Sequence, residues 1–298
     1  MIVARPLPIT LAQVPPHPLT VPLADFAAET RELLARLGRT RVLVYPELHL
    51  CGVDTSRGGV RQQLRDAAEP LDGPRVAELA ELARELGIWL LPGSVVERGE
   101  NGELFNTALA FSPEGRLAAS YRKIFPWRPY EPYDSGDRFV VFDLDGIGQV
   151  GFAICYDIWF PEVARHLAWM GAELIVNPVM TTTKDRAQEL VLVRAAAIVN
   201  QVFVVSVNTA GPTGTGHTLV VDPEGAVRTE APGDAPAVVT DLLDLDEVAR
   251  VRTHGTAGVN RMWDQFTDAD APIELPLYEG RIDPRRWRPA GHPPPATS

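Results

Sequence analysis

The amino-acid sequence predicts a layered α/β fold, and three observations support this prediction. Short runs rich in Val, Ile, Leu and Phe recur at strand length, and most are bounded by Gly, Pro or Asp. Helical patterns alternate with these runs in the first half of the chain, and strands become more frequent in the second half. Several runs, such as RVLVYP and VFVVSVN, are apolar on both faces, which is typical of central strands covered on each side. No internal repeat is visible, so the pattern favours layers over a barrel of eight repeats.

The expected strands share a short apolar core and are Arg41–Pro46, Ile88–Val96, Phe105–Phe111, Phe139–Leu144, Val150–Cys155, Leu174–Pro178, Val202–Asn208, Thr218–Asp222 and Ala237–Leu242. The expected helices carry apolar residues at helical spacing and are Ala24–Leu37, Arg75–Leu86, Pro161–Gly171 and Lys184–Asn200. The last of these is apolar nearly all round after its first turn, so we expect it to be buried.

The chain has 298 residues, of which 45% are hydrophobic, and this is enough to bury a large core. No Gly/Ser-rich linker divides it, so we expect a single domain over residues 1–266. Residues 267–298 form an expected C-terminal extension that wraps either the body or a partner subunit. Its proline-rich end, Arg288–Ser298, is expected to be loose.

The net charge of −11 argues against a nucleic-acid or anionic-membrane partner, because either would need a basic face. No stretch approaches the roughly 20 consecutive apolar residues of a membrane-spanning helix. Met1–Thr20 is interrupted by prolines and makes a poor signal peptide. Cys51 and Cys155 form no metal-binding motif, and we expect both to stay reduced. These features predict a cytoplasmic protein that needs no metal or organic cofactor.

Four polar side chains stand at places where chemistry is expected, although each also has an ordinary interpretation. Cys155 ends an apolar strand before a turn and a helix, where α/β folds bind ligands; alone, it could be a buried structural cysteine. Glu47 follows VLVYP, and Lys123 lies in SYRKIFPW. Glu131 lies in the loop RPYEPYDSG. Taken singly, these three residues read as loop or surface charges.

Together these residues supply what acyl transfer requires. A thiol is a weak nucleophile until a base removes its proton, and a carboxylate can do so. Attack on an amide carbonyl creates an oxyanion, which a lysine can stabilise. The set therefore predicts a thiol hydrolase.

The same residues lie in three blocks that resemble the nitrilase, or carbon–nitrogen hydrolase, superfamily. The blocks read VLVYPEL around Glu47, YRKIFPW around Lys123 and GFAICYDIWFPE around Cys155, in the family's order. The resemblance extends from about Thr10 to Phe266, with supporting pieces at Met170–Pro178 and Asp222–Gly225. It implies a four-layer αββα sandwich that usually assembles into dimers across one helical face.

The resemblance also implies roles for these residues. Cys155 looks like the nucleophile and Glu47 like the general base. Lys123 looks like the cation that stabilises the oxyanion, together with the backbone N–H of Tyr156. Glu131 occupies the place of the family's second glutamate, which positions substrate or water. The loop RKIFPWRPYEPYDSG, with Trp127 and Pro129, resembles the aliphatic amidase and formamidase version.

Further residues are expected to line the pocket, because they follow the Cys155 strand and the Leu174–Pro178 strand. They are Trp159, Met180, Thr181 and Thr182, for which simple packing is the alternative. His217 replaces the serine or threonine usual in the family and is expected to be a hydrogen-bonded turn residue rather than a catalyst.

The expected reaction is hydrolysis of a small linear amide to an acid and ammonia through a cysteine thioester. The alternatives are a nitrilase acting on a nitrile, an N-carbamoyl hydrolase, acyl transfer to an amine, or a non-catalytic interaction module. The partners expected are an amide or nitrile substrate and a second copy of the chain, as a homodimer or a higher homo-oligomer.

Overall fold

Two β-sheets stack face to face in the computed structural model, which describes residues 5–53, 56, 58–276 and 280–282. The first sheet runs in the order β13 (Ala237–Asp244), β1 (Pro6–Gln13), β2 (Val42–Val44), β3 (Trp89–Leu91), β5 (Leu104–Phe111) and β4 (Ser94–Arg98), with β6 (Leu117–Arg122) beside β5. The second runs in the order β12 (Val227–Glu230), β11 (Leu219–Val221), β10 (Phe203–Asn208), β9 (Leu174–Val179), β8 (Gln149–Phe152) and β7 (Val141–Asp143).

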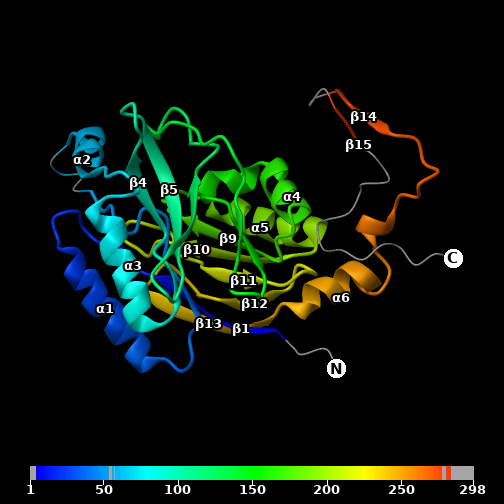
Figure 1. Ribbon diagram of the computed structural model, residues 1–298, viewed down its shortest axis with the longest axis horizontal. Coiled ribbons are helices and arrows are strands. Elements are labelled where there is room, and N and C mark those ends of the chain that lie inside the picture. The colour runs from blue at the N-terminus through cyan, green and yellow to red at the C-terminus, as the bar shows by residue number, and fades with distance from the viewer. Residues whose placement is uncertain (1–4, 54–55, 57, 277–279, 283–298) are drawn as a thin grey trace.

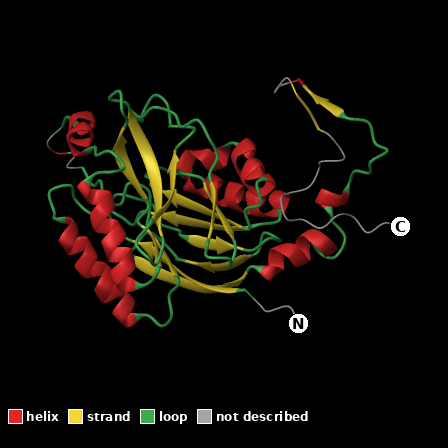
Figure 2. Ribbon diagram, in the orientation of Figure 1, coloured by secondary structure: helices red, strands yellow, loops and turns green. Residues whose placement is uncertain are grey.

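Helices cover the outer face of each sheet, as Figures 1 and 2 show. The first sheet is covered by α1 (Leu23–Arg36) and α3 (Pro74–Leu86), and the second by α4 (Pro161–Trp169) and α5 (Arg186–Asn200). Two further helices, α2 (Val60–Ala67) and α6 (Asp246–His254), complete the described helical part. The order helix, sheet, sheet, helix confirms the predicted four-layer αββα fold.

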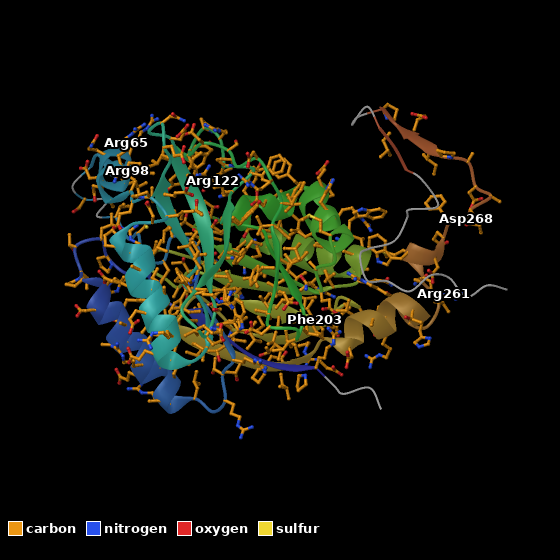
Figure 3. All side chains as sticks on the ribbon, viewed as in Figure 1. Arg65, Arg98, Arg122, Phe203, Arg261 and Asp268 are labelled. Carbon is orange, nitrogen blue, oxygen red and sulfur yellow. The ribbon has the colours of Figure 1, made fainter. Side chains whose placement is uncertain are left out.

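Each pair of neighbouring layers encloses its own apolar core. The central core lies between the sheets and includes Leu11 of β1 and Phe203 of β10, which Figure 3 labels among the strands. A second core joins the first sheet to α1 and α3, and a third joins the second sheet to α4 and α5. Burial of apolar surface on both faces of each sheet stabilises the stack, at about 25 cal/mol per Å².

Parallel strands fix which end of the sandwich can carry a site. In the first sheet β1, β2 and β3 are mutually parallel, and in the second β8, β9 and β10 are. The carboxyl ends of parallel strands meet at one edge of a sheet, so the loops that follow them lie close together. Glu47 follows β2, Cys155 follows β8 and Met180 follows β9.

Two expectations about the elements are wrong. The run Ile88–Val96 forms two strands, β3 and β4, because Pro92 and Gly93 break the ladder between them. The helix at Lys184–Asn200 begins at Arg186 and is not buried all round. Val191 is 65% exposed, and Ile198 and Val199 are 37% and 43% exposed. The helix therefore presents an apolar stripe to solvent.

The sequence pattern also missed elements whose signals are weak. Strand β1 contains Pro6 and Pro8, which read as strand breakers, yet both lie near its start. Helix α2 is mostly polar and buries only Leu64, so it carries little amphipathic signal. In the C-terminal extension β14 (Ile273–Leu275) pairs with β15 (Gly280–Ile282), away from the main sheets in Figure 1. Arg288–Ser298 lies outside the described residues. Within the described part of the chain, no helix is both long and apolar enough to cross a membrane.

A buried histidine gives the fold a defined acid sensitivity. His49 stacks on Tyr45 with ring centroids 4.7 Å apart, and desolvation, with a smaller effect from His17, lowers the pKa of His49 to about 3. Because the unfolded chain takes up this proton near pH 6.5 and the folded chain does not, stability falls as the pH drops from about 6.5 towards 3. Each pKa unit of this difference is worth about 1.4 kcal/mol.

We therefore expect His49→Phe to flatten the loss of thermal stability between pH 6.5 and pH 4, measured as Tm against pH. The exposed His254 provides the control, and His254→Gln should retain the wild-type slope. An unchanged slope in the His49 variant would show that other groups cause the acid sensitivity.

Candidate active site

The loop after β2 carries Glu47 and is held in a single conformation. A Cβ atom at Gly93 would lie 1.7 Å from the Pro46 carbonyl oxygen, and Gly93 has a φ of +82°, so only glycine fits there. The backbone N–H of Leu48 donates to the Ser94 hydroxyl at 2.9 Å. Glu47 is thereby fixed at the end of β2, with its side chain buried.

Lys123 follows β6 and is completely buried, which is rare for a lysine. Its backbone N–H donates to the Asn106 carbonyl at 2.9 Å, and its own carbonyl accepts from Gly136 at 2.8 Å. A side chain at Gly136 would meet the Arg122 carbonyl oxygen, since a Cβ would lie 2.1 Å from it. The chain on both sides of Lys123 is thus fixed by neighbouring backbone.

The Lys123 ammonium lies between two carboxylates. Its Nζ is 2.9 Å from Glu47 Oε1, and 2.8 and 2.9 Å from the two oxygens of Glu131. Burial alone would lower the pKa of Lys123, but Glu47, Cys155 and Glu131 outweigh it and hold that pKa well above its usual value. The pKa of Glu131 is raised by burial and by Glu47, against the opposing effect of Lys123. Lys123 is therefore a permanent cation.

Both oxygens of Glu47 are held. Asn106 Nδ2 donates to Oε1 at 2.8 Å, and the Met180 backbone N–H donates to Oε2 at 2.9 Å. The sequence analysis missed Asn106, although the run FNTALAF places a polar residue in a strand that is buried throughout. A fully buried amide needs a partner, and that requirement was the available signal.

Cys155 begins a short 3₁₀-helix, Cys155–Trp159, directly after β8. Its φ of +46° lies in the left-handed region, which costs a residue other than glycine free energy and is typical of functional positions. Burial, reinforced by Glu47 and opposed by Lys123, raises the pKa of the thiol well above its usual value. The resting sulfur is therefore protonated, and it lies near enough to Glu47, Glu131 and Lys123 for their charges to act on it.

Hydrogen bonds within the Glu131 loop join Trp127 to Glu131. Trp127 donates its backbone N–H to Glu131 Oε2 at 2.9 Å, and the Glu131 N–H returns to the Trp127 carbonyl at 2.9 Å. The rings of Trp127 and Tyr130 pack with centroids 4.4 Å apart, and both are exposed. The Glu131 carboxylate thus contacts Lys123 and also fixes the loop that presents the exposed rings of Trp127 and Tyr130.

The other expected pocket residues are placed in different ways. Tyr156 and Trp159 are half-buried with ring centroids 5.9 Å apart. Met180 is half-buried and contributes its N–H to Glu47. Thr181 is buried, and its hydroxyl donates to Glu189 Oε2 at 2.6 Å. His217 has a φ of +58°, and its Nδ1 lies 3.1 Å from Glu230 Oε1, as expected for a hydrogen-bonded turn residue.

The groups gathered here can perform acyl transfer. A thiol, a carboxylate fixed by Asn106 and Met180, and a buried ammonium are the groups that such a reaction requires as nucleophile, base and charge stabiliser. Charges act strongly on one another in such a buried site. With the four-layer fold, this arrangement is that expected of a hydrolase of carbon–nitrogen bonds.

The chain belongs to the carbon-nitrogen hydrolase family, whose model matches residues 9–253. Among characterised relatives, the omega-amidase NIT2 of Homo sapiens is 34% identical over 201 residues, covering 62% of this chain and 72% of the relative. A formamidase of Pseudomonas syringae pv. tomato is 30% identical over 239 residues, covering 76% and 69%. The protein is thus a hydrolase of non-peptide carbon–nitrogen bonds.

Solved structures place it in the nitrilase superfamily. Nit3 of Saccharomyces cerevisiae, a member of branch 10 of that superfamily, matches with a TM-score of 0.73 at 25% identity, covering 83% of this chain and 93% of Nit3. An amidase mutant from Nesterenkonia sp. AN1 matches with a TM-score of 0.66 at 25% identity, covering 83% and 94%. In that mutant, the acetamide moiety of fluoroacetamide is covalently attached to the active-site cysteine.

Removal of the buried cation should leave Glu47 and Glu131 unpaired. We expect Lys123→Met to destabilise the fold at pH 7 by about 3–5 kcal/mol, the usual cost of breaking a buried pair. The deficit should shrink at pH 5, because burial raises the pKa of Glu131 and a protonated carboxyl needs no counter-charge. Urea unfolding at both pH values measures this, with the exposed Lys184→Met as control. Equal stability of both variants at pH 7 would contradict the assigned ion cluster.

Proposed function

We propose that this protein hydrolyses a small linear amide to a carboxylic acid and ammonia through a thioester on Cys155. The observation that carries the proposal is the buried Lys123 ammonium between Glu47 and Glu131, with the Cys155 thiol in the same electrostatic environment. The amidase relatives support amides as the substrate class. The covalent adduct on the cysteine of the Nesterenkonia amidase supports a thiol nucleophile.

The chemistry follows from the charges. Because the pKa of Cys155 is raised, the thiol must lose its proton to Glu47 as sulfur attacks the amide carbon. The carbonyl oxygen gains negative charge, which Lys123 and the Tyr156 N–H stabilise. Glu47 then passes the proton to the nitrogen, and the carbon–nitrogen bond breaks to release ammonia. Water, activated by Glu47 and positioned with Glu131, cleaves the thioester and restores the thiol.

The surrounding loops supply the proposed substrate contacts. Trp127 and Trp159 offer aromatic surface, and Met180 offers a flexible apolar side chain beside Glu47. The Thr181 hydroxyl donates its hydrogen bond to Glu189, so we propose that Thr181 contacts the substrate through its backbone.

Replacement of the nucleophile tests the proposal. We expect Cys155→Ala to lower ammonia release by about 10⁴-fold or more, because removing a nucleophile removes the covalent route. Mass spectrometry should trap an acyl adduct on the wild type and none on the variant. Cys51 is buried in a different core and provides the control, since Cys51→Ala should keep the rate. Undiminished ammonia release from the Cys155 variant would refute the mechanism.

A substrate panel then separates amides from the alternatives. Amide, nitrile and N-carbamoyl compounds are compared by ammonia release, and an added amine acceptor reports acyl transfer by forming a new amide. We expect the highest kcat/KM for a short linear amide, with the acid as product. A preference for nitriles would reassign the substrate while leaving the thiol mechanism in place.

We also propose a homodimer, formed across α5 and the neighbouring end of α4, in which residues 1–266 form the hydrolase body and the extension from residue 267 wraps either that body or the partner. The apolar stripe of Val191, Ile198 and Val199 supports this, because exposed apolar patches of this kind usually mark interfaces. We place the protein in the cytoplasm, which suits its two free cysteines.

The stripe predicts a change in mass on mutation. We expect Val191→Glu to shift the protein from dimer towards monomer in sedimentation or light-scattering measurements, because a charge would be buried without a partner. Val60→Glu is the control, since Val60 is an exposed valine on a different helix, α2. A dimer that persists at micromolar concentration in the Val191 variant would place the interface elsewhere.

A further inference from the structure

One carboxylate outside the catalytic cluster connects the two loops that carry the nucleophile and the lysine. Asp157 lies two residues after Cys155 and is completely buried. Buried carboxylates are retained only where donors satisfy them, so each partner of this one is informative.

The partners of Asp157 come from both sides of the site. Asp157 Oδ2 accepts the Tyr121 hydroxyl at 2.7 Å and the Ile154 backbone N–H at 2.9 Å. Its Oδ1 accepts the Phe125 backbone N–H at 2.9 Å. Tyr121 and Phe125 stand two residues before and two after Lys123, and Ile154 directly precedes Cys155.

We propose that Asp157 is a positioning residue that fixes the Cys155 sulfur and the Lys123 ammonium relative to each other. This inference rests on the proposed function, in which the nucleophile and the oxyanion-stabilising cation must act on the same carbonyl group.

The backbone at Cys155 explains why such a support is needed. The left-handed φ of +46° persists only where neighbouring bonds determine it. Asp157 provides two of these bonds, because its backbone N–H donates to the Ile154 carbonyl at 2.9 Å while its side chain accepts the Ile154 N–H. The residue before the nucleophile is thus bound on both its N–H and its C=O by one aspartate.

The lysine loop is bound by the same side chain. Tyr121 belongs to the first sheet and Phe125 to the loop after it, whereas Asp157 belongs to the second sheet's loop. The hydrogen bonds from Tyr121 and Phe125 therefore join the two sheets at the site, and the bond from Ile154 fixes the nucleophile loop itself. Burial raises the pKa of Asp157 to about 6, while Lys123 and the Tyr121 hydroxyl favour the charged form. At neutral pH the carboxylate is ionised and can accept all three bonds.

Replacement of Asp157 by asparagine cannot preserve this set. If the amide nitrogen takes the Oδ2 position it faces the Ile154 N–H, and if it takes the Oδ1 position it faces the Phe125 N–H. In either orientation one backbone N–H meets another donor and loses its acceptor. Tyr121→Phe removes only the hydroxyl bond and leaves both backbone bonds.

The test compares Asp157→Asn, Tyr121→Phe and a matched control on the best amide substrate. We expect Asp157→Asn to lower kcat by about 100-fold and to keep KM within about 3-fold of wild type. A small displacement of the reacting groups is enough to lower a rate by about this factor. Tyr121→Phe should lower kcat by about 10-fold, also with little change in KM. Glu173→Gln is the control, because Glu173 also accepts side-chain and backbone donors, from Arg5 and Gln149, but precedes β9 at the end away from the site.

The folded fraction of each variant is measured by circular dichroism, and each rate is expressed per folded molecule. A kcat for Asp157→Asn within about 3-fold of wild type, or an equal loss in Glu173→Gln, would overturn the assignment. If Asp157→Asn does not fold, Tyr121→Phe decides: a reduced kcat supports the assignment and an unchanged kcat refutes it.

A second readout separates this inference from the proposed function. The rate at which iodoacetamide alkylates Cys155 at pH 7 needs no substrate turnover. We expect Asp157→Asn to slow it about 10-fold and Glu173→Gln to leave it unchanged, because thiol activation depends on the placement of Cys155 beside Glu47 and Lys123. If the wild type hydrolyses no amide, the proposed function fails. The alkylation rates then still support or refute the role of Asp157.

Discussion

The buried ammonium of Lys123 is the constraint around which this molecule is organised. A lysine without exposure would lose its charge unless anions surround it, and Glu47 and Glu131 do so within 2.8–2.9 Å. Each carboxylate in turn requires donors, which come from Asn106 and the Met180 N–H for Glu47 and from Trp127 for Glu131. Removing Lys123 leaves both carboxylates without their cation, so the lysine is the group on which the charges of the cluster depend.

Both sheets contribute residues to this cluster. The first sheet supplies Glu47 and Lys123 through the loops after β2 and β6, and the second supplies Cys155 through the loop after β8. Among the described residues, the direct bond from the second sheet to Glu47 is that of the Met180 N–H, just after β9. The geometry of the site therefore depends on how the sheets stack. The central core between them and the hydrogen bonds from Tyr121 and Phe125 to Asp157 both hold that arrangement.

Stability and reactivity are linked through burial. The same desolvation that raises the pKa of Cys155 makes the resting thiol inert, so that reaction requires a base already in place. It also strengthens the field of Lys123 on any charge that develops on a bound carbonyl. In the outer layer of the second sheet, helix α5 leaves apolar residues exposed, and the homodimer proposed above rests on this exposure.

The sequence by itself determined the layered α/β class and most of the strands, and it predicted Cys155, Glu47, Lys123 and Glu131 as site residues, because short apolar runs and the residues at their ends are local features. The resemblance of three blocks to a known family supplied the four-layer arrangement, which no local pattern contains. Only the tertiary structure decided that Asn106 holds Glu47, that Asp157 joins the two loops, and that Val191 faces solvent. These are contacts between residues distant in the chain, or exposures set by neighbouring layers. The strand β1, with its prolines, and the polar helix α2 escaped detection because their neighbours, and not their own propensities, stabilise them.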